Sequence, residues 1–381
     1  MRAAVRRIVW CGLGLACLVG CASDSGGGSS PAGSEDEASA DVTGSPAGGD
    51  GGAGAGTGAD SPDEGGEGTG ASPGSPEQPP PGGPVTGLRL NQIQLYGTHN
   101  SYHVEGTTAL AVPDWAYTHA PLGQQLDEQG VRKFELDLHF VDGDVQVKHV
   151  PVLDEGSHCP LLRDCLEQVK SWSDGNPGHH TVFIQIEPKD DLTSVSDYDT
   201  FFAEIEEDIL RHWPRERIVT PDDVQGSHAT LRDAVLSGEG WPTVEESRGK
   251  LLFFVNHSGE FRDRYSAGMT SLAGRLMFVE SGAEEDVAAF RIMNTPDPEA
   301  IGEAVRAGFM VRTRADGVPL PDDADDRAVR ARDSGAQVIS TDYPVPHDSG
   351  YVFELPGGAP SRCNPINAPE GCAVDWVEAL P

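Results

Sequence analysis

The sequence predicts an α/β fold of the (β/α)8 TIM-barrel type, preceded by a disordered tether. Eight short apolar, β-branched segments recur after residue 85, and polar or amphipathic stretches separate them. Strands that alternate with helices in one domain of this length indicate a parallel sheet, and eight such strands indicate a closed barrel. Polar residues also gather where the predicted strands end, which is the end of a barrel where its chemistry is placed.

The first residues are expected to be a targeting segment. Basic residues precede a short apolar stretch, and the stretch closes on a small residue before Cys21. This order resembles a bacterial lipoprotein signal peptide, so we expect residues 1–20 to be removed and Cys21 to be acylated. The protein would then be exported and anchored to a membrane of the cell envelope, periplasmic or at the cell surface. The alternative is an ordinary secretory signal with a chance Cys.

Residues 21–84 are expected to be a disordered linker. They are rich in Gly, Ser, Pro and acidic residues and contain no aromatic residue, Lys or Arg, so they cannot bury enough apolar surface to fold. We expect the barrel domain at residues 85–349 and a C-terminal extension at residues 350–381. The formal net charge of −34 argues against binding to nucleic acid and suits a protein that holds a divalent cation. We expect a monomer.

Four cysteines remain once the signal peptide and Cys21 are set aside. An even number in an exported protein indicates two disulfides, and we predict the local pairs Cys159 with Cys165 and Cys363 with Cys372. The alternative is a metal site, which the spacing of these cysteines does not favour.

The eight predicted strands are residues 93–98, 131–140, 145–150, 181–187, 250–256, 275–280, 309–314 and 337–342. Predicted helices include residues 161–173, 198–213, 230–236 and 299–307. In the second strand apolar and polar residues alternate, so Glu135, Asp137 and His139 face the barrel axis. Unpaired buried charges cost several kcal/mol each, so these groups must lie at the wet mouth or bind something.

Other predicted strands also end on polar residues, and together these form a ring with a definite chemistry. Its carboxylate and amide oxygens suit Ca2+ or Mg2+ and not zinc. They belong to Asn100, Glu135, Asp137 and Glu187. His99 and His149 remain for proton transfer near neutral pH, and Lys189, Arg312 and Arg314 are suitable donors to a phosphate. Alternatively, the two arginines only neutralise the acidic mouth.

Four motifs occur in order on these strand ends. They are Gly-Thr-His-Asn-Ser-Tyr at 97–102, Phe-Glu-Leu-Asp at 134–137, Lys-His-Val at 148–150 and Ile-Glu-Pro-Lys-Asp-Asp at 186–191. Their order and spacing resemble the X-region of phosphoinositide-specific phospholipase C, and the chain is similar to the bacterial calcium-dependent branch of that family over residues 88–346. Asp137 stands where the metal-independent branch has a basic residue.

The resemblance implies a barrel of the PLC-like phosphodiesterase type, in which Asn100, Glu135, Asp137 and Glu187 ligate Ca2+ and His99 and His149 are catalytic. The implied substrate is a phosphatidylinositol-type lipid at a membrane surface. Its inositol 2-hydroxyl attacks the phosphodiester, which gives diacylglycerol and a cyclic inositol phosphate. His149 is the candidate general acid, while His99 either stabilises the transition state or acts as the base, a role that Glu135 could share. His139 departs from the pattern, because an aromatic residue is expected there.

Two other functions are compatible with these residues. A glycerophosphodiester phosphodiesterase or a sphingomyelinase-D-like lipase has a similar barrel, but Asn100 follows His99 here where the former has a His-Arg-Gly opening. A tethered binding module that has lost catalysis is the third possibility. All six core positions of the motif are filled, which argues against that loss.

Overall fold

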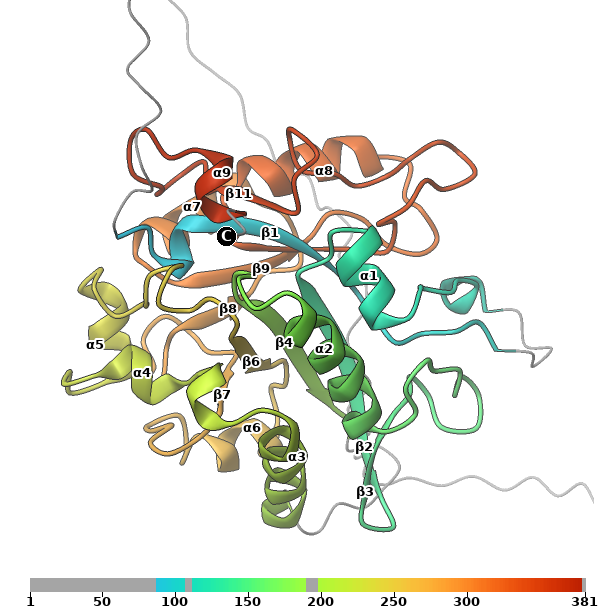
Figure 1. Ribbon diagram of the computed structural model, residues 1–381, viewed down its shortest axis with the longest axis horizontal. Helices are drawn as coiled ribbons and strands as arrows, with labels where there is room; N and C mark the ends of the chain where they lie inside the picture. The colour runs from blue at the N-terminus through green and yellow to red at the C-terminus, as the bar shows by residue number, and fades with distance from the viewer. Residues whose placement is uncertain (1–86, 107–111, 190–197, 379–381) are drawn as a thin grey trace, which may run out of the picture. The chain divides into compact units, whose positions relative to one another are not determined.

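A computed structural model describes residues 87–106, 112–189 and 198–378, which form a mixed α/β fold (Figure 1). The predicted signal peptide, Cys21 and the linker lie outside the described residues. The strands are β1 (Ile93–Thr98), β2 (Lys133–Val141), β3 (Asp144–Val147), β4 (Val182–Pro188), β5 (Ile218–Val219), β6 (Leu251–Val255), β7 (Met277–Val279), β8 (Phe290–Ile292), β9 (Met310–Arg314), β10 (Val338–Thr341) and β11 (Ser361–Cys363).

The α-helices are α1 (Leu122–Glu128), α2 (Leu162–Gly175), α3 (Tyr198–His212), α4 (Pro221–Gln225), α5 (Leu231–Leu236), α6 (Glu260–Tyr265), α7 (Pro298–Arg306), α8 (Ala324–Asp333) and α9 (Val374–Val377). Short 3-10 helices lie at Leu90–Gln92, Pro113–Trp115 and Arg215–Arg217. The four helices predicted from the sequence are confirmed to within two residues at each end. Among the described residues, none of these helices is both long and apolar enough to cross a bilayer.

The strands form two sheets. One has the order β11-β1-β10-β9-β8, and the other has the order β3-β2-β4-β6-β5 with β7 also paired to β6. All neighbours are parallel except the antiparallel pairs β1–β11 and β2–β3. In the parallel pair of β2 and β4, Asp137 lies opposite Glu187, so the carboxyl ends of the strands bring these two side chains to the same edge.

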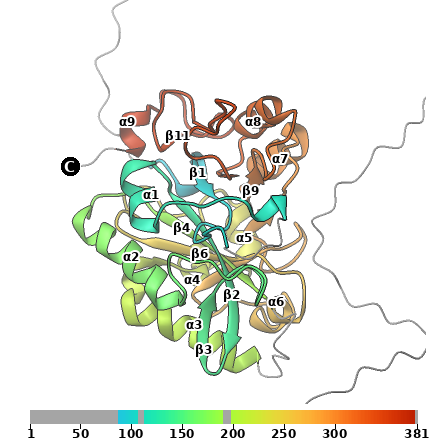
Figure 2. The ribbon, with the colours of Figure 1, turned by 90° about the vertical axis from the view of Figure 1, so that its right-hand side faces the viewer.

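The strand β3 corrects the predicted third barrel strand. It pairs antiparallel with β2 and is not a parallel barrel strand. Only Asp142 and Gly143 separate the two, and both have positive φ, 53° and 85°, as a tight hairpin turn requires. A parallel crossover needs a dozen or more residues, so this connection cannot form one. Figures 1 and 2 show the β2–β3 hairpin extending beyond the other strands.

Nine strands among the described residues nevertheless have a parallel neighbour, because the short strands β5 and β8, which were not predicted, join the seven predicted strands that are parallel. In the described residues they form no single closed sheet, so the closed barrel is not confirmed. The two sheets approach each other at two places, between β1 and β2 and between β7 and β8. The Arg132 N–H donates to the Tyr96 carbonyl at 3.0 Å, and a parallel bridge joins Glu280 to Phe290. Gly97 permits the first approach, because a Cβ there would lie 2.3 Å from the Lys133 oxygen.

The helices cover the sheets through apolar stripes. Along α2, Leu162, Cys165, Leu166 and Val169 are all buried, at the spacing that places them on one helical face. The helix α7 begins sharply because the Asp297 carboxylate accepts from the Glu299 and Ala300 N–H groups and Pro298 occupies the first turn. These helices hold the strands in place and leave the strand ends to the site.

The C-terminal extension packs onto the strands of the first sheet. Its strand β11 pairs antiparallel with β1, and α9 follows after the Cys363–Cys372 disulfide (Figure 1). Arg248, just before β6, donates to the Trp376 and Val377 carbonyls at 3.1 and 3.4 Å. The last part of this extension, from β11 to α9, therefore lies against the amino ends of the strands, opposite the predicted site.

Candidate active site at the carboxyl ends of the strands

His99 follows β1 and is oriented by a buried carboxylate. Its Nδ1 lies 3.0 Å from Oδ1 of Asp342, and Arg314 donates to Oδ2 of the same group at 3.1 Å. Burial alone would raise the pKa of Asp342, but His99 and Arg314 outweigh it and hold the pKa below its usual value. Because an ionised carboxylate only accepts, His99 Nδ1 carries a hydrogen. Nε2 is then the free nitrogen, 3.8 Å from Oε1 of Glu135.

Asn100 lies next to His99 in the left-handed region, with φ of 43°, which Asn tolerates better than most residues. Its side chain lies close to the Tyr117 hydroxyl. Burial raises the pKa of the Tyr117 hydroxyl, the charges of Asp342 and Asp137 add to that rise, and Asn100 opposes it. Asn100 and Asp137 therefore share one neighbour at the mouth of the fold.

Glu135 is buried between two cations. Its Oε2 accepts from Lys133 Nζ at 2.6 Å and from Arg312 Nη2 at 2.9 Å. Burial by itself would raise the pKa of Glu135, but the two cations hold it below its usual value. Burial also lowers the pKa of Lys133 to about 7, with Glu135 opposing that fall. Glu135 thus stays ionised and keeps Oε1 for another partner.

Asp137 is the one buried carboxylate of this group that is poorly satisfied. It is 1% exposed, and neither of its oxygens accepts a hydrogen bond of normal geometry from a described residue. Its nearest cation is Lys189, with Nζ 3.4 Å from Oδ2. Burial raises the pKa of Asp137 well above its usual value, and Lys189, helped slightly by the neighbouring Tyr102 hydroxyl, only partly offsets this. Lys189 also pairs with Glu187, whose Oε2 accepts from Asn256 at 3.0 Å.

The donor set fits a hard dication. Carboxylate and amide oxygens are what Ca2+ prefers, and an added positive charge would compensate the burial of Asp137. Within the described residues, however, no three acidic, His or Cys groups are already gathered around one point. Lys189 lies between the carboxylates of Asp137 and Glu187, and two cations bind the carboxylate of Glu135. The predicted ligands Asn100, Glu135, Asp137 and Glu187 are therefore at one edge without forming a finished cage.

His149 follows β3 and faces the same region. Its Nδ1 lies 2.9 Å from Oδ2 of Asp154, and the ring of Trp115 meets it edge-on at 5.6 Å. Burial lowers the pKa of His149, the hydrogen bond with Asp154 opposes that fall, and the nearby charges of Lys189 and His99 add to it. The two candidate catalytic imidazoles therefore lie close enough to influence each other.

The three predicted phosphate donors are all engaged with acidic groups. Arg312 is 2% exposed and bonds Glu135, Ser340 and Asn294. Arg314 bonds Asp342, and Lys189 pairs with Asp137 and Glu187. Their contacts match the alternative interpretation of the two arginines, which is that they neutralise the acidic mouth.

Sequence reasoning missed several residues that hold the site. Lys133 could have been found, because it lies two positions before Glu135 and so faces the same way. Asp154 gave no such signal, since its role depends on a contact with His103, 51 residues away. His139 has a supporting role as well. Its Nε2 lies 3.1 and 3.3 Å from the carbonyls of Lys148 and His149, so it helps to fix the chain there.

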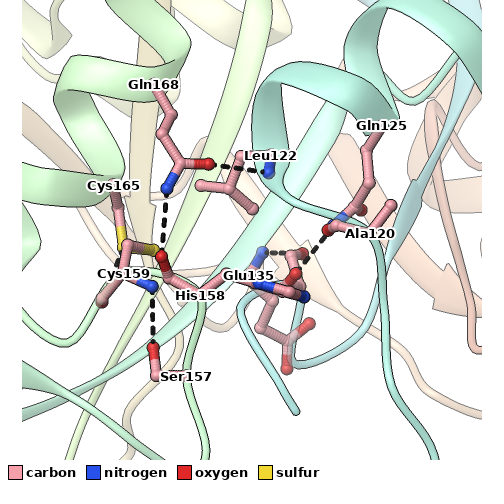
Figure 3. Close-up of a disulfide and its surroundings, with 10 residues drawn as sticks. Ala120, Leu122, Gln125, Glu135, Ser157, His158, Cys159, Cys165 and Gln168 are labelled. Atoms are coloured by element: carbon pink, nitrogen blue, oxygen red, sulfur yellow. Dashed lines mark hydrogen bonds between the residues drawn. A yellow bond between two sulfur atoms is a disulfide. The ribbon is translucent and has the colours of Figure 1, made fainter.

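Both predicted disulfides are confirmed. The Cys159–Cys165 bond joins the segment after His158 to α2 (Figure 3). From α2, Gln168 donates to the His158 carbonyl at 3.1 Å and accepts from the Leu122 N–H at 3.0 Å.

His158 continues this support toward the site. Its Nε2 lies 2.6 Å from the His119 carbonyl, and His119 Nε2 lies 2.9 Å from the His99 carbonyl. Both histidines hold backbone carbonyls. Burial lowers the pKa of His119 to about 4, so its ring is neutral at neutral pH.

Fold and site together define a phosphoric diester hydrolase of the phospholipase C class. The model of the family "Phosphoinositide phospholipase C, Ca2+-dependent" matches residues 88–145 and 140–365. The chain belongs to this family, as its motifs indicate, and the family depends on Ca2+. No curated protein matches the chain.

Solved structures share the fold. The calcium-dependent phosphoinositol-specific phospholipase C of a Pseudomonas species, in its myoinositol complex, is 21% identical, with a TM-score of 0.52 over 72% of this chain and 95% of that chain. Crystal form 1 of the same enzyme is 20% identical, with a TM-score of 0.53 over 73% of this chain and 95% of that chain. The calcium-dependent enzyme from Streptomyces antibioticus is 20% identical, with a TM-score of 0.50 over 68% of this chain and 95% of that chain.

Proposed function

We propose that the protein is a calcium-dependent phospholipase C that cleaves phosphatidylinositol-type lipids at a membrane surface. The observation that carries this proposal is Asp137, a buried carboxylate that lies beside Glu187 and accepts no hydrogen bond of normal geometry from a described residue. Such a group is costly unless a cation compensates it. The family to which the chain belongs supports Ca2+ as that cation.

Asn100, Glu135, Asp137 and Glu187 are the proposed ligands. When bound, Ca2+ supplies positive charge that lowers the pKa of the inositol 2-hydroxyl and balances the charge that develops on the phosphate. Glu135 has Oε1 available for this purpose, because its two cations bond Oε2. Lys189, Arg312 and Arg314 remain proposed phosphate contacts, and Lys189 is the most exposed of the three, at 21% of its side chain.

In the proposed reaction the inositol 2-oxygen forms a bond to phosphorus while the bond from phosphorus to the glycerol oxygen breaks. The 2-hydroxyl proton passes to His99 Nε2 or to Glu135, since Asp342 holds the other ring nitrogen of His99. His149 gives its Nε2 proton to the glycerol oxygen, which leaves as diacylglycerol. The cyclic inositol phosphate is then opened by water, with the two proton transfers reversed.

Three further proposals concern the whole chain. We propose that residues 1–20 are a signal peptide, that Cys21 carries the lipid anchor of a cell-envelope lipoprotein, and that residues 21–84 are a linker. Residues 85–349 would be the catalytic domain, with 350–381 as its extension, acting as a monomer. We also propose that the two sheets are halves of one barrel, which the contacts between β1 and β2 and between β7 and β8 support.

A lipid panel tests the function directly. The full-length protein is incubated with vesicles of phosphatidylinositol, phosphatidylcholine, phosphatidylethanolamine or phosphatidylglycerol, with calcium or with a chelator. We expect a cyclic inositol phosphate from phosphatidylinositol only, and only with calcium. Free glycerol phosphate from deacylated lipid, or a phosphatidic-acid-type product, would instead identify one of the two alternative phosphodiesterases. Tight lipid binding with no product would identify the inactive binding module.

A further inference from the structure

Asp154 is a buried carboxylate that holds two imidazoles at once. It is 2% exposed, and its Oδ2 lies 2.9 Å from His149 Nδ1 and 2.9 Å from His103 Nε2. We propose that Asp154, anchored by His103, is a positioning residue that presents Nε2 of His149 to the leaving group. This inference rests on the proposed function, in which His149 is the general acid.

A strained turn brings Asp154 back to His149, which lies five positions earlier in the chain. The Asp154 N–H donates to the Val150 carbonyl at 2.8 Å, and the Val150 N–H donates to the Asp154 carbonyl at 3.0 Å. Between them, Val152 has φ of 70°, a region that β-branched residues rarely adopt. Val152 is also 79% exposed, so no packing of its own side chain explains this conformation. The two hydrogen bonds between Val150 and Asp154 hold this conformation, and the turn they close places the Asp154 carboxylate beside His149.

His103 fixes the other side of the carboxylate. The ring is fully buried and stacks on Tyr117, with centroids 4.3 Å apart. Its Nδ1 lies 2.9 Å from the Tyr117 carbonyl, which can only accept, so Nδ1 carries a hydrogen and the ring cannot turn without losing that bond. His103 N–H in turn donates to the Asn100 carbonyl at 2.9 Å. Asp154 is therefore tied to the segment that supplies Asn100 and His99.

The consequence for His149 is a defined tautomer. Because the carboxylate accepts from Nδ1, the nitrogen that exchanges protons is Nε2, and no described residue forms a hydrogen bond with it. The same three residues also set the distance between the loop after β3 and the segment after β1. They therefore couple the positions of the two candidate catalytic histidines, which come from different sheets.

The test uses Asp154→Asn, which keeps the size of the side chain but can donate to Nδ1. Nδ1 then carries no hydrogen, so the ring cannot reach the doubly protonated form that gives up its Nε2 proton as an acid. We expect kcat on phosphatidylinositol vesicles to fall by about 10- to 100-fold, with KM changed little. The matched control is Glu155→Gln, at the next position, where the carboxylate is half exposed and pairs with Lys148 at the surface. This control should keep wild-type kcat.

A double-mutant cycle separates positioning from general damage. In a His149→Ala background, Asp154→Asn should cause no further loss of kcat, because Asp154 acts through His149. An equal further loss in that background would overturn the inference. His103→Phe keeps the stacked ring but removes both hydrogen bonds, and should show a smaller loss of kcat that also vanishes without His149.

Imidazole nitrogen NMR gives a readout that does not depend on activity. In the wild-type protein, neutral His149 should carry its hydrogen on Nδ1, and in Asp154→Asn the population should shift to Nε2. If wild-type His149 already carries its hydrogen on Nε2, the inference is wrong, even if no variant folds. If phosphatidylinositol is not cleaved at all, the proposed function fails, while the tautomer measurement still decides the role of Asp154.

Discussion

Two carboxylates at opposite ends of the strands, the partly buried Glu378 and the fully buried Asp137, differ in how well they are satisfied. At the amino end, Glu378 of the C-terminal extension bonds His180 at 3.2 Å and the Ser361 hydroxyl, with Arg132 3.9 Å away. Burial alone would raise its pKa, but His180 and Arg132 outweigh it and lower the pKa to about 2. At the carboxyl end, Asp137 accepts no hydrogen bond of normal geometry from a described residue, and burial raises its pKa well above the usual value.

The difference separates stability from function. When a charge is paired and hydrogen-bonded, its partners offset the cost of removing it from water, so Glu378 contributes to the stability of the folded protein. A buried charge without such partners raises the free energy of the fold and persists where an outside group completes it. The amino end of these strands therefore contributes to stability, and the carboxyl end is arranged for a reaction.

The largest effect is expected from Asp137→Asn. Losing one charged ligand should lower activity by about 10³-fold, because a metal contributes several kcal/mol of charge stabilisation. The free energy of unfolding in a chelator should not fall, since the variant removes a poorly compensated buried charge. Calcium should raise the Tm of the wild-type protein but not that of the variant. A variant that keeps the calcium-induced rise in Tm would show that Asp137 is not a ligand.

His149→Ala tests whether proton transfer and calcium binding at the carboxyl end are carried by different residues. We expect at least about a 10²-fold loss of activity, the lower range for a proton-transfer group. The calcium-induced rise in Tm should remain, because His149 is not a proposed ligand. Activity on phosphatidylinositol that is barely changed, in a folded variant, would remove His149 from the mechanism.

Each disulfide lies nearer to one end of the strands, so removing them one at a time compares the two ends by the same kind of change. Replacing Cys363 and Cys372 with Ser should lower the free energy of unfolding by about 2 to 3 kcal/mol, as expected for a loop of this length, without changing kcat. The matched variant at Cys159 and Cys165 should lose slightly less stability, since its loop is shorter. It should also lose activity, because the His158 segment supports His99. Equal effects on kcat would contradict the division between the two ends.

Glu378→Gln should have the smallest effect, about 1 to 2 kcal/mol of stability at neutral pH, as for a charge-assisted hydrogen bond. Its depressed pKa determines the pH dependence. The stabilisation by Glu378 is complete above the unfolded pKa near 4.5 and is lost as the pH falls toward about 2. Urea unfolding of both proteins at several pH values measures this. A stability difference that stays constant below pH 4.5 would mean that the charge of Glu378 contributes nothing.

Much of the arrangement at the carboxyl edge could be predicted from the order of the residues alone. The alternation along β2 places Glu135 and Asp137 on one face, and the parallel strands bring Glu187 to the same edge. These are consequences of local geometry, because side chains alternate with period two and parallel strands end together. The Asp-Gly pair at 142–143 is a typical hairpin turn and could also have been predicted. The apolar residues 145–150 after it nevertheless resembled a parallel barrel strand.

The sequence by itself determined the family, the local disulfides and the set of residues that reach the carboxyl edge, because each depends on short-range spacing. Only the tertiary structure decided which charges are satisfied. The pairing of Glu135 with Arg312, of His103 with Asp154 and of His180 with Glu378 joins residues 177, 51 and 198 positions apart. Such contacts depend on how the helices and strands pack together, so they cannot be predicted from the spacing of residues along the chain.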